Sequence, residues 1–410
     1  PHISPALDRM AAQGLRFTRA YSNSPVCSPT RFALMTGRYQ YRLRGAAEEP
    51  MTARFYGSTT VGLPPAHPTL PSMLKAAGYR TALIGKWHLG YPPHFGPLLS
   101  GYDEHIGPLS GGISYFSHLD RAGDIDLFEN GVRVDHQGHY LTDLLSDRAV
   151  DYVQARAADH QPFLLSLHYT APHWPWETRD APATPPMTGA RLGHLDGGSV
   201  DIYHQMVREM DEGIGRMLAA LDGGGIGDDT LVVFTSDNGG ERFSDNWPLV
   251  GGKMDLTEGG IRVPAISRWP KQIGGGGVST QHHLTMDWTA TMLASAGVAA
   301  DPAHPLDGVD LQPALADPAH TFERPMHWRM KHRQQRAMRI GRWKYLKVDE
   351  HEYLFDVEAD ARERANRAAN EPARLDRMRT DWEAWDRTMR PIDPDALVSL
   401  VYGPKDMPSR

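Results

Sequence analysis

The sequence predicts an α/β fold in which a mostly parallel central sheet is flanked by helices, with a smaller antiparallel sheet and a packed helix at the C-terminus. Hydrophobic strands alternate with amphipathic helices up to about residue 320. After that point short strand candidates follow one another through tight turns. The chain of 410 residues is also too long for one ordinary small core. We therefore expect a large domain over 1–320 and a C-terminal subdomain over 321–410.

The periodicity of apolar residues and the turn residues between them predict each element in turn. Residues 95–140 show weak periodicity and are expected to form long loops with short elements. The predicted helices are 5–13, 28–36, 70–77, 141–157, 200–221, 284–296 and 364–385. The predicted strands are 17–21, 79–84, 163–168, 230–236, 263–267, 326–330, 335–340, 343–348 and 353–357.

Two helix starts carry clear end signals. Ser28 followed by Pro29 is typical of an N-cap and a first helical position, and Gly37 ends that helix. Thr69 is expected to cap the next helix. On the long helix over 200–221, the acidic residues Glu209 and Asp211 are expected on a solvated face.

Composition and charge exclude several classes of protein. The formal charge of -7, without a dense Lys/Arg stripe, gives no reason to expect a nucleic-acid partner. No apolar run of the length that a membrane helix needs is present, so we expect no membrane span. A single cysteine, Cys27, excludes an internal disulfide. The chain begins at Pro1 without a signal segment, so we expect it to be cut at its front, with any export signal upstream.

Polar residues follow three of the predicted strands, and one cysteine precedes a predicted helix. Lys86 and His88, His173, and Asp237 come after successive strands, and Cys27 lies just before the helix over 28–36. In open α/β sheets, ligands bind outside the carboxyl ends of the strands. A helix N-terminus adds free N–H groups that favour an anion. These four segments are therefore expected to converge on one anion-binding pocket.

The segment from Cys27 to Arg38 resembles the signature of the type I, formylglycine-dependent sulfatases. It reads Cys-Ser-Pro-Thr-Arg at 27–31 and continues to Thr36-Gly37-Arg38. Further resembling segments occur in the family's order: Gly78-Tyr79-Arg80-Thr81, Gly85-Lys86-Trp87-His88, Ala171-Pro172-His173, Ser236-Asp237-Asn238-Gly239, Gly252-Lys253, Trp343-Lys344-Tyr345 and Tyr353-Leu354-Phe355-Asp356. The resemblance covers nearly the whole chain. It implies an alkaline-phosphatase-like fold, an arylsulfatase-like hydrolase and a periplasmic or secreted location.

The resemblance also implies a nucleophile. Cys27 would be oxidised to formylglycine by a maturation enzyme and hydrated to a gem-diol. One hydroxyl would attack sulfur and form a covalent sulfo-enzyme, and the other would then expel sulfate. Arg31 would hold the diol, His173 would protonate the leaving alcohol, and His88 would assist the removal of a proton when sulfate is expelled.

The same resemblance implies a metal and a sulfate site. Asp237 and Asn238, together with the modified Cys27, would bind a divalent cation, with calcium expected and magnesium as the alternative. The cation would polarise the sulfate. Lys86, Lys253 and His173 would bind the sulfate oxygens of a small-molecule or carbohydrate sulfate ester.

One feature departs from the family. Type I sulfatases have two further metal carboxylates, an Asp-Asp pair that ends an N-terminal strand before the cysteine. Only 26 residues precede Cys27, and Asp8 lies in a predicted helix rather than in such a pair. We therefore expect an upstream segment that supplies the first strand and the remaining metal ligands.

Several alternatives stay open on sequence grounds. A phosphonate monoester or phosphodiester hydrolase uses the same groups, and a catalytically silent sulfate-binding homologue would also retain the motifs. The turn-forming Asn238-Gly239 and a solvated Lys253 are the simplest structural interpretations of those residues. Trp174 and Trp176 could line either a leaving-group site or a loop core. Contacts to the leaving group are expected from 41–65, 95–125 and 176–198.

Overall fold

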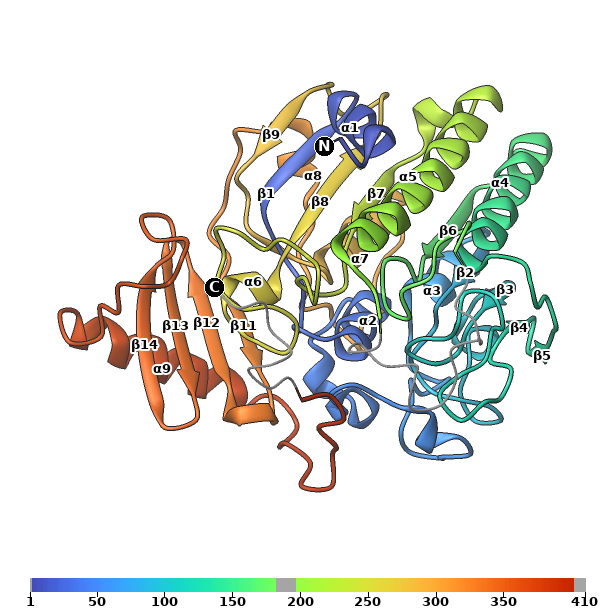
Figure 1. Ribbon diagram of the computed structural model, residues 1–410. Coiled ribbons are helices and arrows are strands. Elements are labelled where there is room, and N and C mark those ends of the chain that lie inside the picture. Colours follow the sequence, from blue (N-terminus) through green and yellow to red (C-terminus); the bar gives the residue numbers. More distant parts are fainter. Residues whose placement is uncertain (1, 182–196, 402–410) are drawn as a thin grey trace.

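A computed structural model describes residues 2–181 and 197–401 of the chain (Figure 1). Its strands form two mixed five-stranded sheets and one antiparallel four-stranded sheet. The α/β class and the separate antiparallel C-terminal sheet are therefore as predicted. The expected excursion over 172–198 and the end of the C-terminal segment lie partly outside the described residues.

The first sheet is built around a buried parallel strand. The strand β2 (Arg80–Gly85) pairs in parallel with β3 (Glu104–Gly107) on one side and with β6 (Phe163–His168) on the other. Two short antiparallel strands, β4 (Phe128–Glu129) and β5 (Val132–Arg133), extend its edge. The short strands and loops expected between 95 and 140 are thus present, and the parallel core of the sheet matches the prediction.

The second sheet is less parallel than expected. The strand β1 (Leu15–Tyr21) pairs in parallel with β9 (Gly277–Ser279) and β10 (His283–Leu284). It also pairs in the antiparallel sense with β8 (Arg262–Arg268), which in turn is antiparallel to β7 (Val232–Thr235). The reason lies in the connection. The chain leaves β7, loops back through α6 (Glu258–Ile261) and enters β8 without a crossover helix, so β8 runs in the opposite direction.

Helices cover these sheets, and α4 and α5 lie side by side in Figure 1. Leu144 and Leu145 of α4 share one hydrophobic cluster with Met206 and Met210 of α5 and with strand residues such as Ile84. The helices of this part are α1 (Pro5–Ala12), α2 (Cys27–Thr36), α3 (Leu70–Ala76), α4 (Leu141–Asp159), α5 (Val200–Gly223), α7 (Asp287–Ser295) and α8 (Gln312–Ala316). Among the described residues, no helix is both long and apolar enough to cross a membrane.

Three helix starts differ from the prediction. The helix α2 begins at Cys27 rather than Ser28, because the Ser28 hydroxyl accepts a hydrogen bond from the Met51 N–H at 2.9 Å instead of capping the helix. The helix α7 begins at Asp287, whose carboxylate accepts from the Leu284 N–H at 2.7 Å. The C-terminal helix α9 (Pro372–Asp386) begins eight residues later than 364, at its proline.

The expectation that Glu209 and Asp211 lie on a solvated face is wrong. Both side chains of α5 are buried. The Asp211 carboxylate accepts from the backbone N–H groups of Ala6 and Leu7, at 2.7 and 2.9 Å. These are orphan donors in the first turn of α1, so a buried acid is stabilised by the start of a distant helix.

The C-terminal sheet, drawn in orange in Figure 1, forms a lobe beside the two other sheets. Its strands β11 (Met326–Arg329), β12 (Arg336–Ile340), β13 (Trp343–Val348) and β14 (His351–Asp356) form antiparallel hairpins, and α9 packs on them. The Trp328 indole donates to the Ser22 carbonyl at 2.8 Å, and the Trp382 indole donates to the Trp328 carbonyl at 2.9 Å. Trp328 is therefore a packing residue that joins the lobe to the segment before α2.

A buried ionic cluster also joins the lobe to the rest of the chain. Lys344 of β13 pairs with Glu258 of α6 at 3.1 Å and with Glu363 at 2.9 Å, and all three side chains are almost fully buried. Glu258 also accepts from the Tyr21 hydroxyl at 2.6 Å. The cluster thus connects β13 to the segment that leads into β8.

Candidate active site

The predicted site residues come together at one edge of the two larger sheets. Lys86 and His88 follow β2, His173 follows β6, Asp237 and Asn238 follow β7, and Cys27 is the first residue of α2. Gly85 permits this approach, because its φ is 115° and a Cβ there would lie 2.0 Å from the His168 carbonyl oxygen. Lys86, His88, His173 and Asp237 therefore lie beyond the carboxyl ends of strands, as predicted from the sequence.

Arg31 links three of the segments. Its guanidinium binds the Asp237 carboxylate through Nε at 2.9 Å and Nη2 at 2.8 Å, and Nη1 donates to the Lys86 carbonyl at 2.9 Å. The same Nη1 lies 3.2 Å from Nδ1 of His168. A planar fork of donors in this geometry fixes the relative position of α2 and the ends of β2, β6 and β7.

Cys27 is buried among charged groups. Its side chain is 3% exposed, and its sulfur interacts electrostatically with the ammonium groups of both Lys86 and Lys253. Burial lowers the pKa of Lys86. Burial also acts to lower the pKa of Lys253, but the neighbouring Glu241 and Cys27 outweigh it and the pKa is raised. Two cations beside a helix N-terminus are chemically suited to a tetrahedral anion.

His88 is held by a backbone carbonyl. Its Nε2 lies 2.7 Å from the Met51 carbonyl oxygen, which can only accept, so Nε2 carries the proton and Nδ1 is the unprotonated atom. Nδ1 is buried and has no hydrogen-bond partner among the described residues. The backbone of His88 is in the left-handed region, with φ of 63°. Burial and the charge of Lys86 hold its pKa well below the ordinary value, so the ring is a neutral base.

His173 and Lys253 are in direct contact. Nε2 of His173 lies 3.2 Å from Nζ of Lys253, and Nδ1 donates to the Trp174 carbonyl at 2.6 Å. Burial, followed by the charges of Lys253 and Lys86, holds the pKa of His173 well below its ordinary value. The imidazole is therefore neutral without a substrate, and an added negative charge beside it would favour its protonated form.

Asp237 and Asn238 supply oxygen ligands for a hard cation. Burial disfavours the Asp237 carboxylate, but the charges of Arg31, Lys86 and Lys253 outweigh it and lower its pKa to about 2. The Asn238 Oδ1 is buried without a hydrogen-bond partner in the described structure, while its Nδ2 donates to the Gly239 carbonyl. An ionised carboxylate beside an unsatisfied amide oxygen fits a divalent cation. No group of three or more His, Cys, Asp or Glu side chains within residues 2–181 and 197–401 is arranged for a metal.

Two residues of the cluster were not predicted. His168 contacts Arg31, and burial together with the charge of Arg31 lowers its pKa to about 3. Glu241 accepts from Lys253 Nζ at 2.9 Å and from the Trp174 indole at 3.0 Å. Their positions, at the end of a predicted strand and four residues after Asp237, were the only signals in the sequence. Trp174 and Trp176 are buried in the core, which is the loop-core interpretation.

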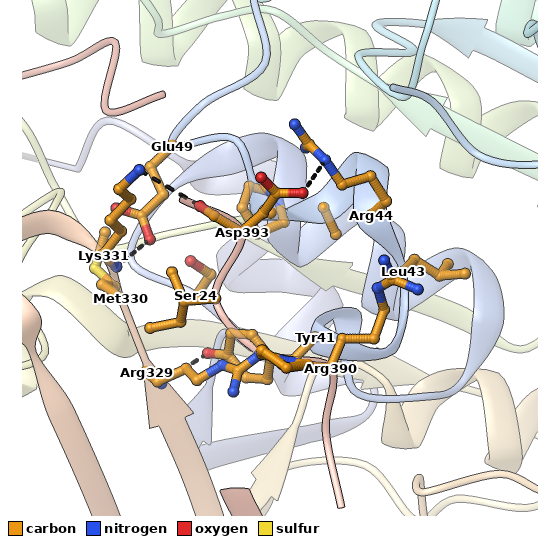
Figure 2. Close-up of a pocket in the computed structure, with 15 residues that line it drawn as sticks. Ser24, Tyr41, Leu43, Arg44, Glu49, Arg329, Met330, Lys331, Arg390 and Asp393 are labelled. Carbon is orange, nitrogen blue, oxygen red and sulfur yellow. Dashed lines mark hydrogen bonds and ion pairs between the residues drawn. The ribbon is translucent and has the colours of Figure 1, made fainter. Parts of the chain in front are cut away.

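A separate cavity lies beside the C-terminal lobe (Figure 2). It is lined by segments 41–49, 329–331 and 390–393, with Arg44 paired to Asp393 at 2.6 Å. Its Lys331 donates to the backbone carbonyls of Pro394 and Ala396 at 2.5 and 2.6 Å. None of the eight predicted site residues lines this cavity, although Pro29 of α2, two residues after Cys27, does.

Comparisons with known proteins identify the family of the chain. A family model described as Sulfatase matches residues 1–298. The N-acetylgalactosamine-6-sulfatase of Sus scrofa is 34% identical over 346 residues, which cover 79% of this chain and 63% of the relative. The steryl-sulfatase of Mus musculus is 30% identical, and the match covers 78% of this chain and 62% of the relative. This chain therefore spans less than two thirds of the length of these curated relatives.

Solved structures extend the likeness over nearly the whole chain. Ps i-CgsB, solved in complex with k-i-k-neocarrahexaose, has a TM-score of 0.86 and 31% identity and covers 97% of this chain and 89% of its own. A phosphonate monoester hydrolase of Silicibacter pomeroyi shares the fold, with a TM-score of 0.65 and 19% identity. The match covers 94% of this chain and 90% of that structure. With the matched family model and relatives above 30% identity, the chain belongs to the sulfatase family.

Proposed function

We propose that this chain carries the catalytic centre of a sulfuric ester hydrolase, in which a formylglycine derived from Cys27 is the nucleophile. The observation that carries the proposal is the burial of Cys27 at the start of α2, within electrostatic reach of Lys86 and Lys253 and one helical turn from Arg31. Cys27 also packs in the hydrophobic cluster of Tyr21, Val26 and Ala33, but packing does not require the neighbouring cations, whereas a nucleophile for an anionic ester does.

The chain's own residues then have distinct tasks. Lys86 and Lys253 neutralise the sulfate oxygens, and Arg31, held by Asp237, supports the nucleophile. His173 contacts Lys253. The negative charge of a bound sulfate ester raises the proton affinity of the His173 imidazole, which then gives a proton to the leaving alcohol. His88 accepts a proton at Nδ1, the atom left unprotonated by the Met51 carbonyl.

A divalent cation completes the proposed site. Calcium, with magnesium as the alternative, would be held by oxygens of Asp237 and Asn238 and by the modified Cys27. When bound, such a cation polarises the sulfate group. Arg31 orients the Asp237 carboxylate through two nitrogens, which fixes one ligand before the ion arrives.

For the substrate we propose a sulfated carbohydrate. The relatives support this choice, because one is named for N-acetylgalactosamine-6-sulfate chemistry and Ps i-CgsB was solved with a neocarrahexaose. An aryl sulfate serves as the test substrate, because it reports on the same sulfate site without needing the sugar contacts.

The test begins with maturation of Cys27. We expect the Cys27 peptide, from cells that contain a formylglycine-generating enzyme, to be lighter than the cysteine form by about 18 Da, the difference between a thiol-bearing carbon and an aldehyde. The matured protein, supplied with calcium, should hydrolyse an aryl sulfate faster than an aryl phosphonate. Faster turnover of the phosphonate would support the alternative hydrolase, and a matured protein inactive on both would support a silent sulfate-binding homologue.

The matched variant is Cys27→Ala, which should abolish turnover while its unfolding curve stays close to that of the unmodified chain. Turnover at the original rate in this variant would contradict the assignment of the nucleophile.

A further inference from the structure

We propose that Glu241 is a positioning residue that holds Lys253 and His173 in the arrangement needed to bind sulfate and protonate the leaving alcohol. The inference rests on the proposed function and deepens it. Glu241 lies on the loop after β7, four residues beyond Asp237, and its side chain is 13% exposed. It is placed to act through its neighbours rather than on the substrate.

The contacts of Glu241 form a closed ring of four residues. Its Oε2 accepts from Lys253 Nζ at 2.9 Å, and its Oε1 accepts from the Trp174 indole N–H at 3.0 Å. Lys253 Nζ lies 3.2 Å from Nε2 of His173, and Nδ1 of His173 donates to the Trp174 carbonyl at 2.6 Å. The ring joins the loop after β6 to two parts of the connection between β7 and α6, so one carboxylate fixes these two loops to each other.

Within this ring, the contact between Glu241 and Lys253 compensates the positive charge of the lysine. The lysine is 3% exposed and lies in the same cluster as Lys86 and Arg31, so its ammonium needs a compensating carboxylate. Asp237 compensates Arg31 directly, at 2.8 Å, and Glu241 is the acid in direct contact with Lys253. A second anchor fixes the backbone of the lysine, whose N–H donates to the Gly240 carbonyl at 2.9 Å. Removing the Glu241 charge therefore changes the ammonium group without releasing the segment.

The contacts of Trp174 with His173 and Glu241 fix the orientation of the His173 ring. Because the Trp174 carbonyl can only accept, Nδ1 carries a proton and Nε2 faces Lys253. The Trp174 side chain is in turn held by Glu241 through the indole N–H. The carboxylate thus acts on both partners of the Lys253–His173 contact, from opposite sides.

The experiment replaces the acceptor groups one at a time in the matured enzyme. Glu241→Gln removes the charge and replaces one acceptor oxygen by a donor, Glu241→Asp keeps the charge, and Trp174→Phe removes the indole N–H that donates to Glu241. Glu371, whose side chain is 41% exposed and pairs with Arg374 at 3.4 Å, supplies the control Glu371→Gln. We measure kcat and KM for an aryl sulfate with a good leaving group and for an alkyl or sugar sulfate with a poor one.

We expect Glu241→Gln to lower kcat about 100-fold for the poor leaving group and about 10-fold for the good one, because only the poor one depends fully on a positioned acid. Glu241→Asp should recover at least part of the loss, and Trp174→Phe should show the same preference for leaving group with a smaller effect. Equal losses on both substrates, or a kcat within about twofold of the parent, would overturn the proposal.

A binding measurement keeps this test independent of turnover. Calorimetry with inorganic sulfate, in the presence of calcium, should show about 10-fold weaker binding for Glu241→Gln than for the parent and no change for Glu371→Gln. Unchanged sulfate affinity would contradict the role of Glu241. If the sulfate affinity depends on Glu241 as expected but the matured parent protein cleaves neither ester, the proposed function alone is contradicted.

Discussion

At the scale of single residues, His88 gives the sharpest test of the proposed order of events. Its Nδ1 is the unprotonated atom, and we place it at the expulsion of sulfate rather than at the cleavage of the ester. We expect His88→Ala to release about one equivalent of alcohol rapidly and then to turn over about 100-fold more slowly than the parent, because only the second half of the cycle lacks its base. Rapid-quench measurement of the released alcohol checks this.

The control for this variant is His94→Ala, since His94 is exposed. It should leave both phases unchanged. A slow first release of alcohol in His88→Ala, without a burst, would show that His88 acts before the ester is cleaved.

The sequence predicted the members of the site better than their connections. Cys27, Lys86 and Asp237 could be placed because each follows or precedes an element whose end the sequence marks. Glu241 could not, because its role depends on how the loop after β6 and the connection between β7 and α6 fold against each other. Local sequence carries no signal for contacts of that kind.

At the scale of elements, Glu49 fixes the segment before α3 to the end of β11. Its carboxylate accepts from the backbone N–H groups of Lys331 and His332 at 2.7 and 2.9 Å. The neighbouring Met51 holds both Ser28 and His88. The contact therefore connects the C-terminal lobe with the residues around α2.

This contact predicts a pH dependence. Burial outweighs the two N–H donors and raises the pKa of Glu49 from 4.5 to about 7, so the folded state favours the protonated acid. The contribution of protonated Glu49 to stability is fully present below about pH 4.5 and is lost as the pH rises through about 7. This loss lowers the free energy of unfolding by on the order of 3 kcal/mol. Denaturant titrations of the parent and of Glu49→Gln across this window should differ in slope, with the variant flatter.

Other acids titrate in the same range, so the comparison uses the difference between the two proteins. Glu371→Gln serves again as the control and should follow the parent. A variant with the parent's slope would show that Glu49 is ionised throughout.

The ends of elements were harder to predict than their presence. The helix α9 was expected from 364 but starts at Pro372, because the backbone before it turns at Glu363, with φ of 50°, and Asn366 accepts from the Leu354 N–H at 3.0 Å. A polar side chain that bonds to a distant strand competes with helix formation. Only the folded hairpin provides that competing partner.

At the scale of the whole molecule, the cluster of Lys344, Glu258 and Glu363 joins the C-terminal lobe to the rest of the chain. We expect Lys344→Met to lower the free energy of unfolding by about 3–5 kcal/mol, because it removes the ion-pair partner of the buried Glu363 and leaves Glu258 with only its longer contacts to Arg339 and Arg262. Thermal and denaturant unfolding measure this loss. Lys347→Met on the same strand, at a partly exposed position, is the matched control.

A loss below about 1 kcal/mol in Lys344→Met would contradict the importance of the cluster. Restoration of stability by Glu363→Gln in the Lys344→Met background would support it, since that change removes the carboxylate whose ion pair the first substitution breaks.

The alternation of strands and helices was enough to predict the α/β class, but not the direction of every strand. The sequence of an apolar strand such as β8 does not distinguish parallel from antiparallel pairing. Its direction follows from the short return through α6, which the sequence shows only as a Gly-rich segment. The antiparallel C-terminal sheet was predictable because tight turns leave no room for a crossover.

The burial of Cys27 also bears on when the protein can be made active. Its side chain is 3% exposed, and eight of the other nine residues of α2 are buried as well. Under the mechanism proposed above, a maturation enzyme must reach the Cys27 sulfur, which the described fold buries. We therefore predict that the oxidation precedes folding, and that the folded, unmodified protein is not converted by a formylglycine-generating enzyme.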